Sequence, residues 1–129
     1  MATPLESQLA EFFRGSAEAI ACVYLFGSVA RGDSDAKSDV DIAVLYQQEP
    51  TSGFDALGIP LAAELERWLG RPVDVVVMNR APVDLVHRVL RDGILVFERD
   101  PAFRIRFEVS ARSKYLDLKP VLDLYRRAG

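Results

Sequence analysis

The sequence is poor in the residues that build disulfide and histidine-metal frameworks. Its 129 residues include one cysteine, one histidine and one tryptophan. A single cysteine, Cys22, cannot form an internal disulfide, and its place in the apolar run AIACVYLF predicts a buried structural thiol. His87 alone makes neither a metal cluster nor a catalytic triad, and its helical surroundings indicate a packing or surface role. Trp68 is expected at a helix–sheet interface.

Long hydrophobic runs are also absent. No apolar run reaches the roughly 18 residues of a membrane span, and the N-terminal stretch MATPLESQLAEFF lacks the basic start and apolar centre of a signal peptide. We therefore expect a cytoplasmic protein without membrane contact. The apolar fraction of 50% and the charged fraction of 27% are typical of a globular chain, and 129 residues suit one domain with its own core.

Positive charge is scarce over most of the chain. The net charge of −3 argues against a general nucleic-acid binder, so no direct nucleic-acid binding is expected. The distribution is uneven, because residues 1–100 carry nine Lys and Arg against sixteen Asp and Glu, whereas residues 101–129 carry seven against three. The basic tail indicates either a solvated helix face or a surface for an acidic partner or for phosphates.

Short strands and helices alternate along the chain. Runs rich in β-branched and aromatic residues predict strands at residues 20–26, 40–46, 73–78 and 94–97. Apolar residues at helical spacing predict helices at residues 4–15, 54–69, 82–92 and 101–127. In the last helix, Pro120 is expected to cause a break or a restart. This alternation predicts an α/β (α+β) fold with a mixed β-sheet flanked by helices.

One connection is longer and more polar than the others. It reads GSVARGDSDAKSDVD and follows the first predicted strand. If Gly27 and Ser28 lead into a short helical turn at residues 29–31, free backbone N–H groups point outward and no side chain at Gly27 keeps an anion away. This pattern is typical of a phosphate site, although a Gly-Ser pair can also be no more than a helix N-cap.

Four charged residues of the same connection are weaker candidates. Arg31 and Lys37 could contact phosphate, and Arg31 is favoured because it comes directly after the Gly-Ser turn. Asp33 and Asp35 are interpreted as loop residues that aid solubility, since nothing places them on a strand face.

Three aspartates form the second candidate feature. Asp39 and Asp41 are two residues apart at the start of a strand, so their carboxylates lie on one face, while Val40 and Ile42 point into the core. Two neighbouring carboxylates repel unless a cation lies between them, and Mg²⁺ suits such a pair. Asp74 lies in the apolar strand RPVDVVV, where a buried aspartate would need a partner. The alternatives are a solvated turn at Asp39 and Asp41, and an Asp74 at the exposed start of its strand, paired with Arg71 or Arg80.

These residues together resemble the polymerase-β-like nucleotidyltransferase superfamily, whose signature is G-S-x₁₀-D-x-D. The form GSxARG…SDxDI is that of its smallest members, the minimal nucleotidyltransferases (MNT). The resemblance implies a polymerase-β-like fold, one MNT domain over residues 1–129 and a C-terminal helix at residues 101–127. It also implies a set of roles for the candidate residues. Catalytic and metal-binding roles, with two Mg²⁺ ions, fall to Asp39, Asp41 and Asp74, and ATP-binding roles to Gly27, Ser28 and Arg31.

The tail adds a narrower resemblance. KYLDLKPVLDLY, at residues 114–125, looks like the C-terminal helix of MNT antitoxins, which are encoded beside HEPN ribonuclease toxins. This resemblance implies transfer of AMP from ATP to a hydroxyl, expected to be a tyrosine, of a partner HEPN toxin, which silences the toxin. Two alternatives stay open: a non-catalytic antitoxin that neutralises its partner by binding, and a small-molecule nucleotidyltransferase.

Overall fold

The computed structural model describes residues 4–16, 18–32, 39–50 and 53–128. Helices and strands alternate along these segments as the sequence predicts. Their bounds are α1 (Pro4–Arg14), β1 (Ile20–Phe26), α2 (Gly27–Arg31), β2 (Val40–Tyr46), α3 (Gly53–Ala56), α4 (Ile59–Leu69), β3 (Val73–Val77), α5 (Val83–Asp92), β4 (Ile94–Glu98) and α6 (Pro101–Ala128).

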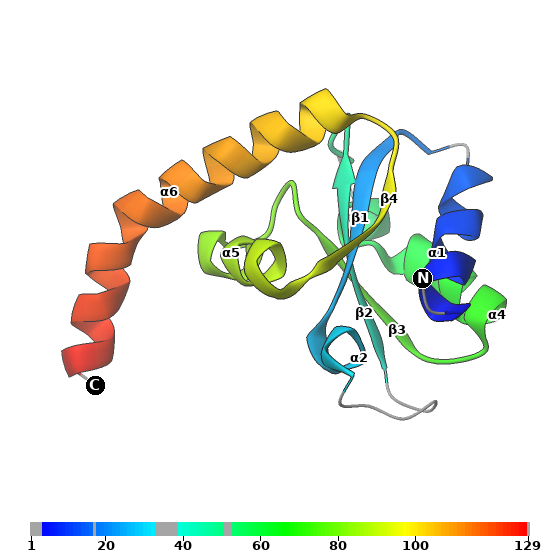
Figure 1. Ribbon diagram of the computed structural model, residues 1–129, viewed down its shortest axis with the longest axis horizontal. Coiled ribbons are helices and arrows are strands. Elements are labelled where there is room, and N and C mark those ends of the chain that lie inside the picture. The colour runs from blue at the N-terminus through cyan, green and yellow to red at the C-terminus, as the bar shows by residue number, and fades with distance from the viewer. Residues whose placement is uncertain (1–3, 17, 33–38, 51–52, 129) are drawn as a thin grey trace.

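The strands form one mixed sheet in the order β3-β2-β1-β4. The two central strands, β1 and β2, are antiparallel, and β4 pairs antiparallel with β1. Only the β2–β3 pair is parallel among the strands of the described segments. Figure 1 shows α1 and α4 on one side of the sheet and α5 and α6 on the other. This arrangement confirms the predicted α/β (α+β) class.

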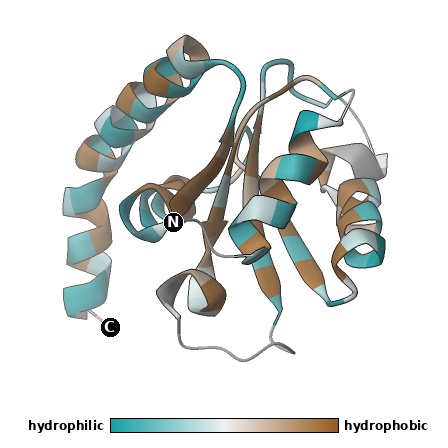
Figure 2. Cartoon of the chain, turned by 45° about the vertical axis from the view of Figure 1, so that its right-hand side comes forward, coloured by the Kyte–Doolittle hydropathy of each residue, from teal (hydrophilic) through white to brown (hydrophobic). Residues whose placement is uncertain are grey.

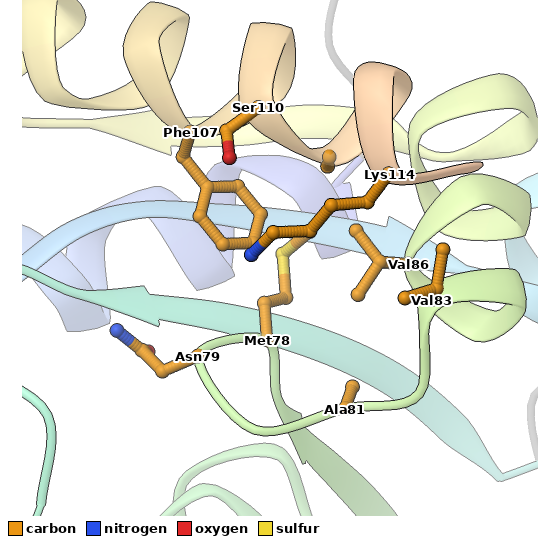
Figure 3. Close-up of a pocket in the computed structure, with 9 residues that line it drawn as sticks. Met78, Asn79, Ala81, Val83, Val86, Phe107, Ser110 and Lys114 are labelled. Atoms are coloured by element: carbon orange, nitrogen blue, oxygen red, sulfur yellow. The ribbon is translucent and has the colours of Figure 1, made fainter. Parts of the chain in front are cut away.

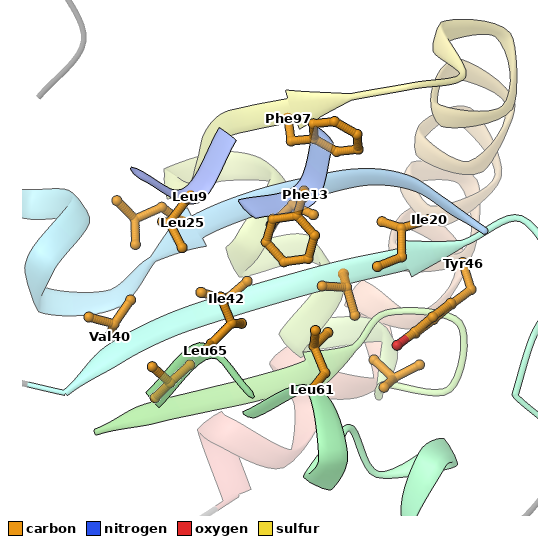
Figure 4. Close-up of a cluster of buried hydrophobic side chains, with 14 residues drawn as sticks. Leu9, Phe13, Ile20, Leu25, Val40, Ile42, Tyr46, Leu61, Leu65 and Phe97 are labelled. Carbon is orange, nitrogen blue, oxygen red and sulfur yellow. The ribbon is translucent and has the colours of Figure 1, made fainter. Parts of the chain in front are cut away.

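Each face of the sheet packs its own hydrophobic layer, as the brown strands enclosed by helices in Figure 2 show. The layer under α1 and α4 is drawn in Figure 4 and contains Leu9, Phe13, Ile20, Val23, Leu25, Val40, Ile42, Val44, Tyr46, Leu61, Leu65, Val73, Val77 and Phe97. The layer under α5 and α6 contains Ala21, Cys22, Tyr24, Ala43, Leu45, Met78, Val86 and Val89. Side chains alternate between the two faces of a strand. A strand residue buried in one layer therefore places the next residue along the strand on the opposite face of the sheet.

The predicted helix over residues 54–69 is wrong as a single element. Two helices, α3 and α4, are separated at Gly58, which has a left-handed backbone with φ +75°. A Cβ at Gly58 would lie 2.7 Å from the Cγ1 atom of Val75. The chain therefore breaks where its backbone packs closely on β3, which helical spacing of apolar residues cannot reveal.

The predicted break at Pro120 is also wrong, because α6 runs through it without interruption. A proline removes one helical hydrogen bond and crowds the carbonyl of residue 116, which usually bends a helix. Pro120 is exposed, so water can satisfy the freed carbonyl, and Figure 1 shows the helix changing direction in its C-terminal part. Although α6 has 28 residues, no helix of the described segments is long and apolar enough to cross a bilayer.

The single cysteine, histidine and tryptophan each pack against other parts of the fold. Cys22 is a buried free thiol, as expected. His87 packs its ring on Tyr115 of α6, with the ring centroids 3.5 Å apart and the planes parallel within 1°. The expectation for Trp68 is wrong: it is 50% exposed and touches the ring of Phe12 edge-on, between α4 and α1, instead of filling a helix–sheet interface.

Candidate active site

The Gly-Ser turn and two of the aspartates meet at one end of the sheet. α2 begins at Gly27, directly after the last residue of β1. Across the antiparallel pair, Phe26 lies opposite Asp41, and across the parallel pair Asp41 lies opposite Asp74. Figure 1 shows α2 and the start of β2 at this same end. Strand pairing thereby brings together Asp41, which is 14 positions after Gly27, and Asp74, which is a further 33 positions along the chain, at one end of the sheet.

The first two aspartates occupy the sheet face that carries α5 and α6. Val40 and Ile42 are fully buried in the opposite layer, under α1 and α4. Because side chains alternate along a strand, Asp39 and Asp41 point to the other face. Asp39 is exposed and Asp41 is partly buried. The predicted orientation of Val40, Asp41 and Ile42 agrees with the structure, and that of Asp39 stays a prediction.

Gly27 is in direct contact with Asp41. Its φ of +76° is a left-handed conformation that side chains rarely adopt. A Cβ at position 27 would lie 2.2 Å from the Oδ2 atom of Asp41, which is far inside contact distance. The sequence suggests that Gly27 is bare to admit a phosphate. The structure gives a second reason, since the Asp41 carboxylate occupies the space of a side chain there.

Ser28 lies inside the first turn of α2. Phe26 is the N-cap residue of this helix and provides no side-chain hydrogen bond to it. Ser28 is therefore not the N-cap residue of this helix, and phosphate binding by the Gly-Ser turn stays a prediction. The backbone N–H groups at the start of α2 are consequently not satisfied by the N-cap side chain, which suits an anion-binding turn.

The expectation that Asp74 is buried is wrong. Asp74 is exposed, while its neighbour Val73 is buried in the opposite layer. Indeed, no polar or charged residue is buried among the described residues. Neither α5 nor α6 buries Asp74, so its carboxylate avoids the cost of burial. It lies beside Asp41 and is accessible to a substrate, and its role in catalysis stays a prediction.

The donor set fits a magnesium ion that shares its coordination with a substrate. Within the described segments, no three His, Cys, Asp or Glu side chains form a group that could hold a metal ion by themselves. Mg²⁺ is commonly bound by one or two carboxylates and completes its shell with water and phosphate oxygens. Asp39 and Asp41, at the start of β2 beside the Gly-Ser turn, match that requirement. Asp39, Asp41 and Asp74, the three carboxylates that the resemblance implies, do not lie close enough together here to form a three-ligand metal site by themselves.

Of the four weaker candidates, only Arg31 is among the described residues. Arg31 is the last residue of α2, so its backbone lies one turn from Gly27. Lys37, Asp33 and Asp35 lie outside the described residues.

A polar contact that the sequence patterns did not predict fixes α6 to the sheet. The Tyr24 hydroxyl donates a hydrogen bond of 2.5 Å to Oε1 of Glu108, and Nη1 of Arg104 donates one of 3.0 Å to Oε2. Arg104 also pairs with Glu98 of β4. Burial and the bond to Glu108 raise the pKa of Tyr24 above its ordinary value. A tyrosine in a wholly apolar strand, and a glutamate four residues after an arginine, were the available signals.

The Gly-Ser turn therefore lies beside Asp41 at one end of a mixed sheet. Residues 7–102 match the family described as Polymerase beta, Nucleotidyltransferase. This match spans most of the chain, and the chain belongs to that family. The family and the fold expected from the Gly-Ser and aspartate spacing are both confirmed.

Individual relatives add detail. "Protein adenylyltransferase MntA" of Aphanizomenon flos-aquae is 35% identical over 83 residues, a match that spans 57% of this chain and about half, 54%, of that protein. A toxin-antitoxin crystal structure with AMP-PNP has a TM-score of 0.70 at 24% identity, covering 94% of this chain and 98% of that one. A complex of tri-AMPylated Shewanella oneidensis HEPN toxin with MNT antitoxin has a TM-score of 0.68 at 24% identity, covering 94% and 95%. At this identity the structural matches establish the fold.

Proposed function

We propose that this chain is a Mg²⁺-dependent protein adenylyltransferase that acts as an antitoxin. It moves AMP from ATP to a hydroxyl, expected to be a tyrosine, of a partner HEPN-type toxin in the cytoplasm. The observation that carries the proposal is the position of Asp41, which contacts Gly27 and lies opposite Asp74. The relative named as a protein adenylyltransferase and the fold shared with an MNT antitoxin bound to AMPylated toxin support it.

The nucleotide end of the reaction belongs to α2. The backbone N–H groups of the first turn, at Gly27 and Ser28, bind the triphosphate of ATP, and the Ser28 hydroxyl adds one hydrogen bond. Arg31, at the end of α2, is proposed as a further phosphate contact. These groups hold the α-phosphorus next to the aspartates and stabilise the charge that develops on the leaving pyrophosphate.

The aspartates serve the attacking end. Asp39 and Asp41 would hold one or two magnesium ions, with Asp74 as a further ligand. Magnesium bound there neutralises phosphate charge and lowers the pKa of the acceptor hydroxyl. Asp74 orients that hydroxyl and accepts its proton. The acceptor oxygen forms a bond to the α-phosphorus, the bond from this phosphorus to the bridging oxygen breaks, and pyrophosphate leaves. AMP remains as an ester of the acceptor.

A paired substitution separates this enzyme from a pure binder. Asp39→Asn with Asp41→Asn keeps the side-chain shapes and removes both negative charges. We expect this variant to bind the toxin, transfer no labelled AMP and release an active toxin when the two are separated. Asp84→Asn, which removes a charge from α5, should transfer AMP like the wild type. If the first variant protected against the toxin as well as the wild type, the non-catalytic alternative would be correct.

A small-molecule nucleotidyltransferase is the remaining alternative. It predicts AMP transfer to a low-molecular-weight hydroxyl compound in the absence of the toxin. The same labelled-ATP assay, with the products separated by size, distinguishes the two acceptors.

A further inference from the structure

A small cavity lies between α5, α6 and the turn after β3 (Figure 3). Its volume is about 70 Å³, which is several times the space that one water requires. Its walls are mostly apolar, with Asn79, Ser110 and Lys114 as the polar members, and they come from three segments of the chain. They include Met78 after β3, Val83 and Val86 of α5, and Phe107 and Ala111 of α6. A cavity of this size and lining suits an aliphatic side chain.

A cation, Lys114, lies at the rim of this cavity. Figure 3 shows the Lys114 side chain extended across the opening, with its amino nitrogen toward Phe107 and Met78. The structure gives this ammonium group no ion pair or hydrogen bond within the described segments. Lys119, in contrast, bonds Asp123 at 2.9 Å on the same helix. An unpaired ammonium group over an apolar cavity favours a ligand that is aliphatic and carries a carboxylate.

The cavity continues into a longer surface. Phe107, Ala111, Lys114, Leu118, Val121 and Tyr125 follow one another at alternating spacings of four and three residues, which keeps them on one face of α6; we name this set the α6 seam. At the cavity the seam packs on α5, but further along Val121 is 47% exposed and Tyr125 is 73% exposed. Figure 2 shows hydrophobic residues continuing along α6 toward its C-terminal end.

We propose that the α6 seam, together with its cavity, binds an amphipathic helix of a partner protein. One aliphatic side chain of that helix enters the cavity, and an aspartate or glutamate beside it pairs with Lys114. Exposed apolar residues spaced at helical intervals are the surface that amphipathic helices recognise. The charge argues for an acidic partner and against a second copy of α6, because residues 101–129 carry seven Lys and Arg against three Asp and Glu.

The position of the seam connects docking with the candidate active site. Asp39 and Asp41 point to the sheet face that α5 and α6 cover, and α6 runs back toward the end of the sheet where α2 lies (Figure 1). A protein held on the seam therefore lies on the same side of the sheet as the aspartates. The identity of the partner that provides this helix, the HEPN-type toxin, rests on the proposed function.

The test compares two valine substitutions on one helix. Val121→Asp introduces a charge into the seam, whereas Val109→Asp places the same charge on a residue that is 59% exposed and two positions from both Phe107 and Ala111, hence on the opposite side of α6. Titration calorimetry with the purified HEPN-type toxin should show at least about tenfold weaker binding for Val121→Asp and unchanged binding for Val109→Asp. Circular dichroism confirms that both variants fold.

A third variant tests the role of the cation. Lys114→Gln keeps most of the aliphatic stem and removes the charge. We expect it to weaken toxin binding and to make the affinity less dependent on salt concentration than it is for the wild type. An unchanged salt dependence would overturn the assigned role of Lys114.

Measuring AMP transfer in the same samples distinguishes this inference from the proposed function. If the wild type transfers AMP but Val121→Asp binds as tightly, or Val109→Asp loses as much affinity, the docking surface is wrong and the enzyme stands. If Val121→Asp alone loses binding but the wild type transfers no AMP, the docking surface stands and the proposed activity is wrong. A wild-type chain that does not bind the toxin overturns the docking inference.

Discussion

Gly27→Ala is the substitution that tests the geometry of the candidate active site most closely. The added Cβ would lie 2.2 Å from Oδ2 and 3.0 Å from Cγ of Asp41, so the carboxylate has to move by about 1 Å to regain an ordinary contact. The same position requires φ +76°, which costs a residue with a Cβ about 1–2 kcal/mol. The displacement of the Asp41 carboxylate and the backbone strain both follow from one added methyl group, so each effect needs its own control.

Gly32→Ala supplies the control for backbone strain. Gly32 also has φ +76°, yet a Cβ there meets nothing within 4 Å among the described residues. Both alanine variants should therefore lose about 1–2 kcal/mol of unfolding free energy in urea because of their backbones. Only Gly27→Ala displaces a carboxylate, and misplaced ligands typically weaken metal binding about 10–100-fold.

Titration calorimetry with ATP, in Mg²⁺ and in chelator, measures this difference. For the wild type we expect clearly tighter ATP binding with Mg²⁺, because carboxylates and phosphates share the ion. In Gly27→Ala most of this enhancement should be lost, whereas in Gly32→Ala it should remain. Equal enhancement in the two variants would show that the contact between Gly27 and Asp41 does not position a metal ligand.

Three further outcomes are expected. Ser28→Ala should weaken ATP binding by about 0.5–1.5 kcal/mol, the worth of one hydrogen bond, in the same calorimetric assay. Gly58→Ala, which brings a Cβ to 2.7 Å from Val75, should lose about 2–4 kcal/mol of unfolding free energy, against about 1–2 kcal/mol for Gly70→Ala, whose left-handed glycine has open space around it. Burial raises the pKa of the Cys22 thiol from 9.0 to about 12. Since the folded state binds this proton more tightly, stability should be full below about pH 9 and fall as the pH rises toward 12, and Cys22→Ala should flatten that decline in urea titrations.

The strands and the spacing of the site were predictable from the sequence for a simple physical reason. A strand repeats every two residues, so the apolar residues Val40 and Ile42 are enough to predict that the aspartates beside them lie on the other face. Register is different, because the pairing of Asp41 with Asp74 depends on which strands are neighbours. The family resemblance supplied that connection, whereas hydrophobic periodicity could not.

The wrong predictions arise where tertiary contacts override local patterns. Apolar spacing continues across Gly58, but close packing on Val75 breaks the helix there. An aspartate inside an apolar strand suggests burial, yet the helices above the sheet do not cover Asp74. Such features depend on which surfaces meet in three dimensions.

The most direct test of the proposed activity is the mass of the acceptor. The HEPN-type toxin is incubated with this protein, ATP and Mg²⁺, separated from it, and weighed intact by mass spectrometry. We expect a gain of about 329 Da for each AMP, the mass left when the acceptor oxygen displaces pyrophosphate at the α-phosphorus. Asp39→Asn with Asp41→Asn should give no gain. A toxin that is fully inhibited by the wild type but unchanged in mass would contradict the proposed activity.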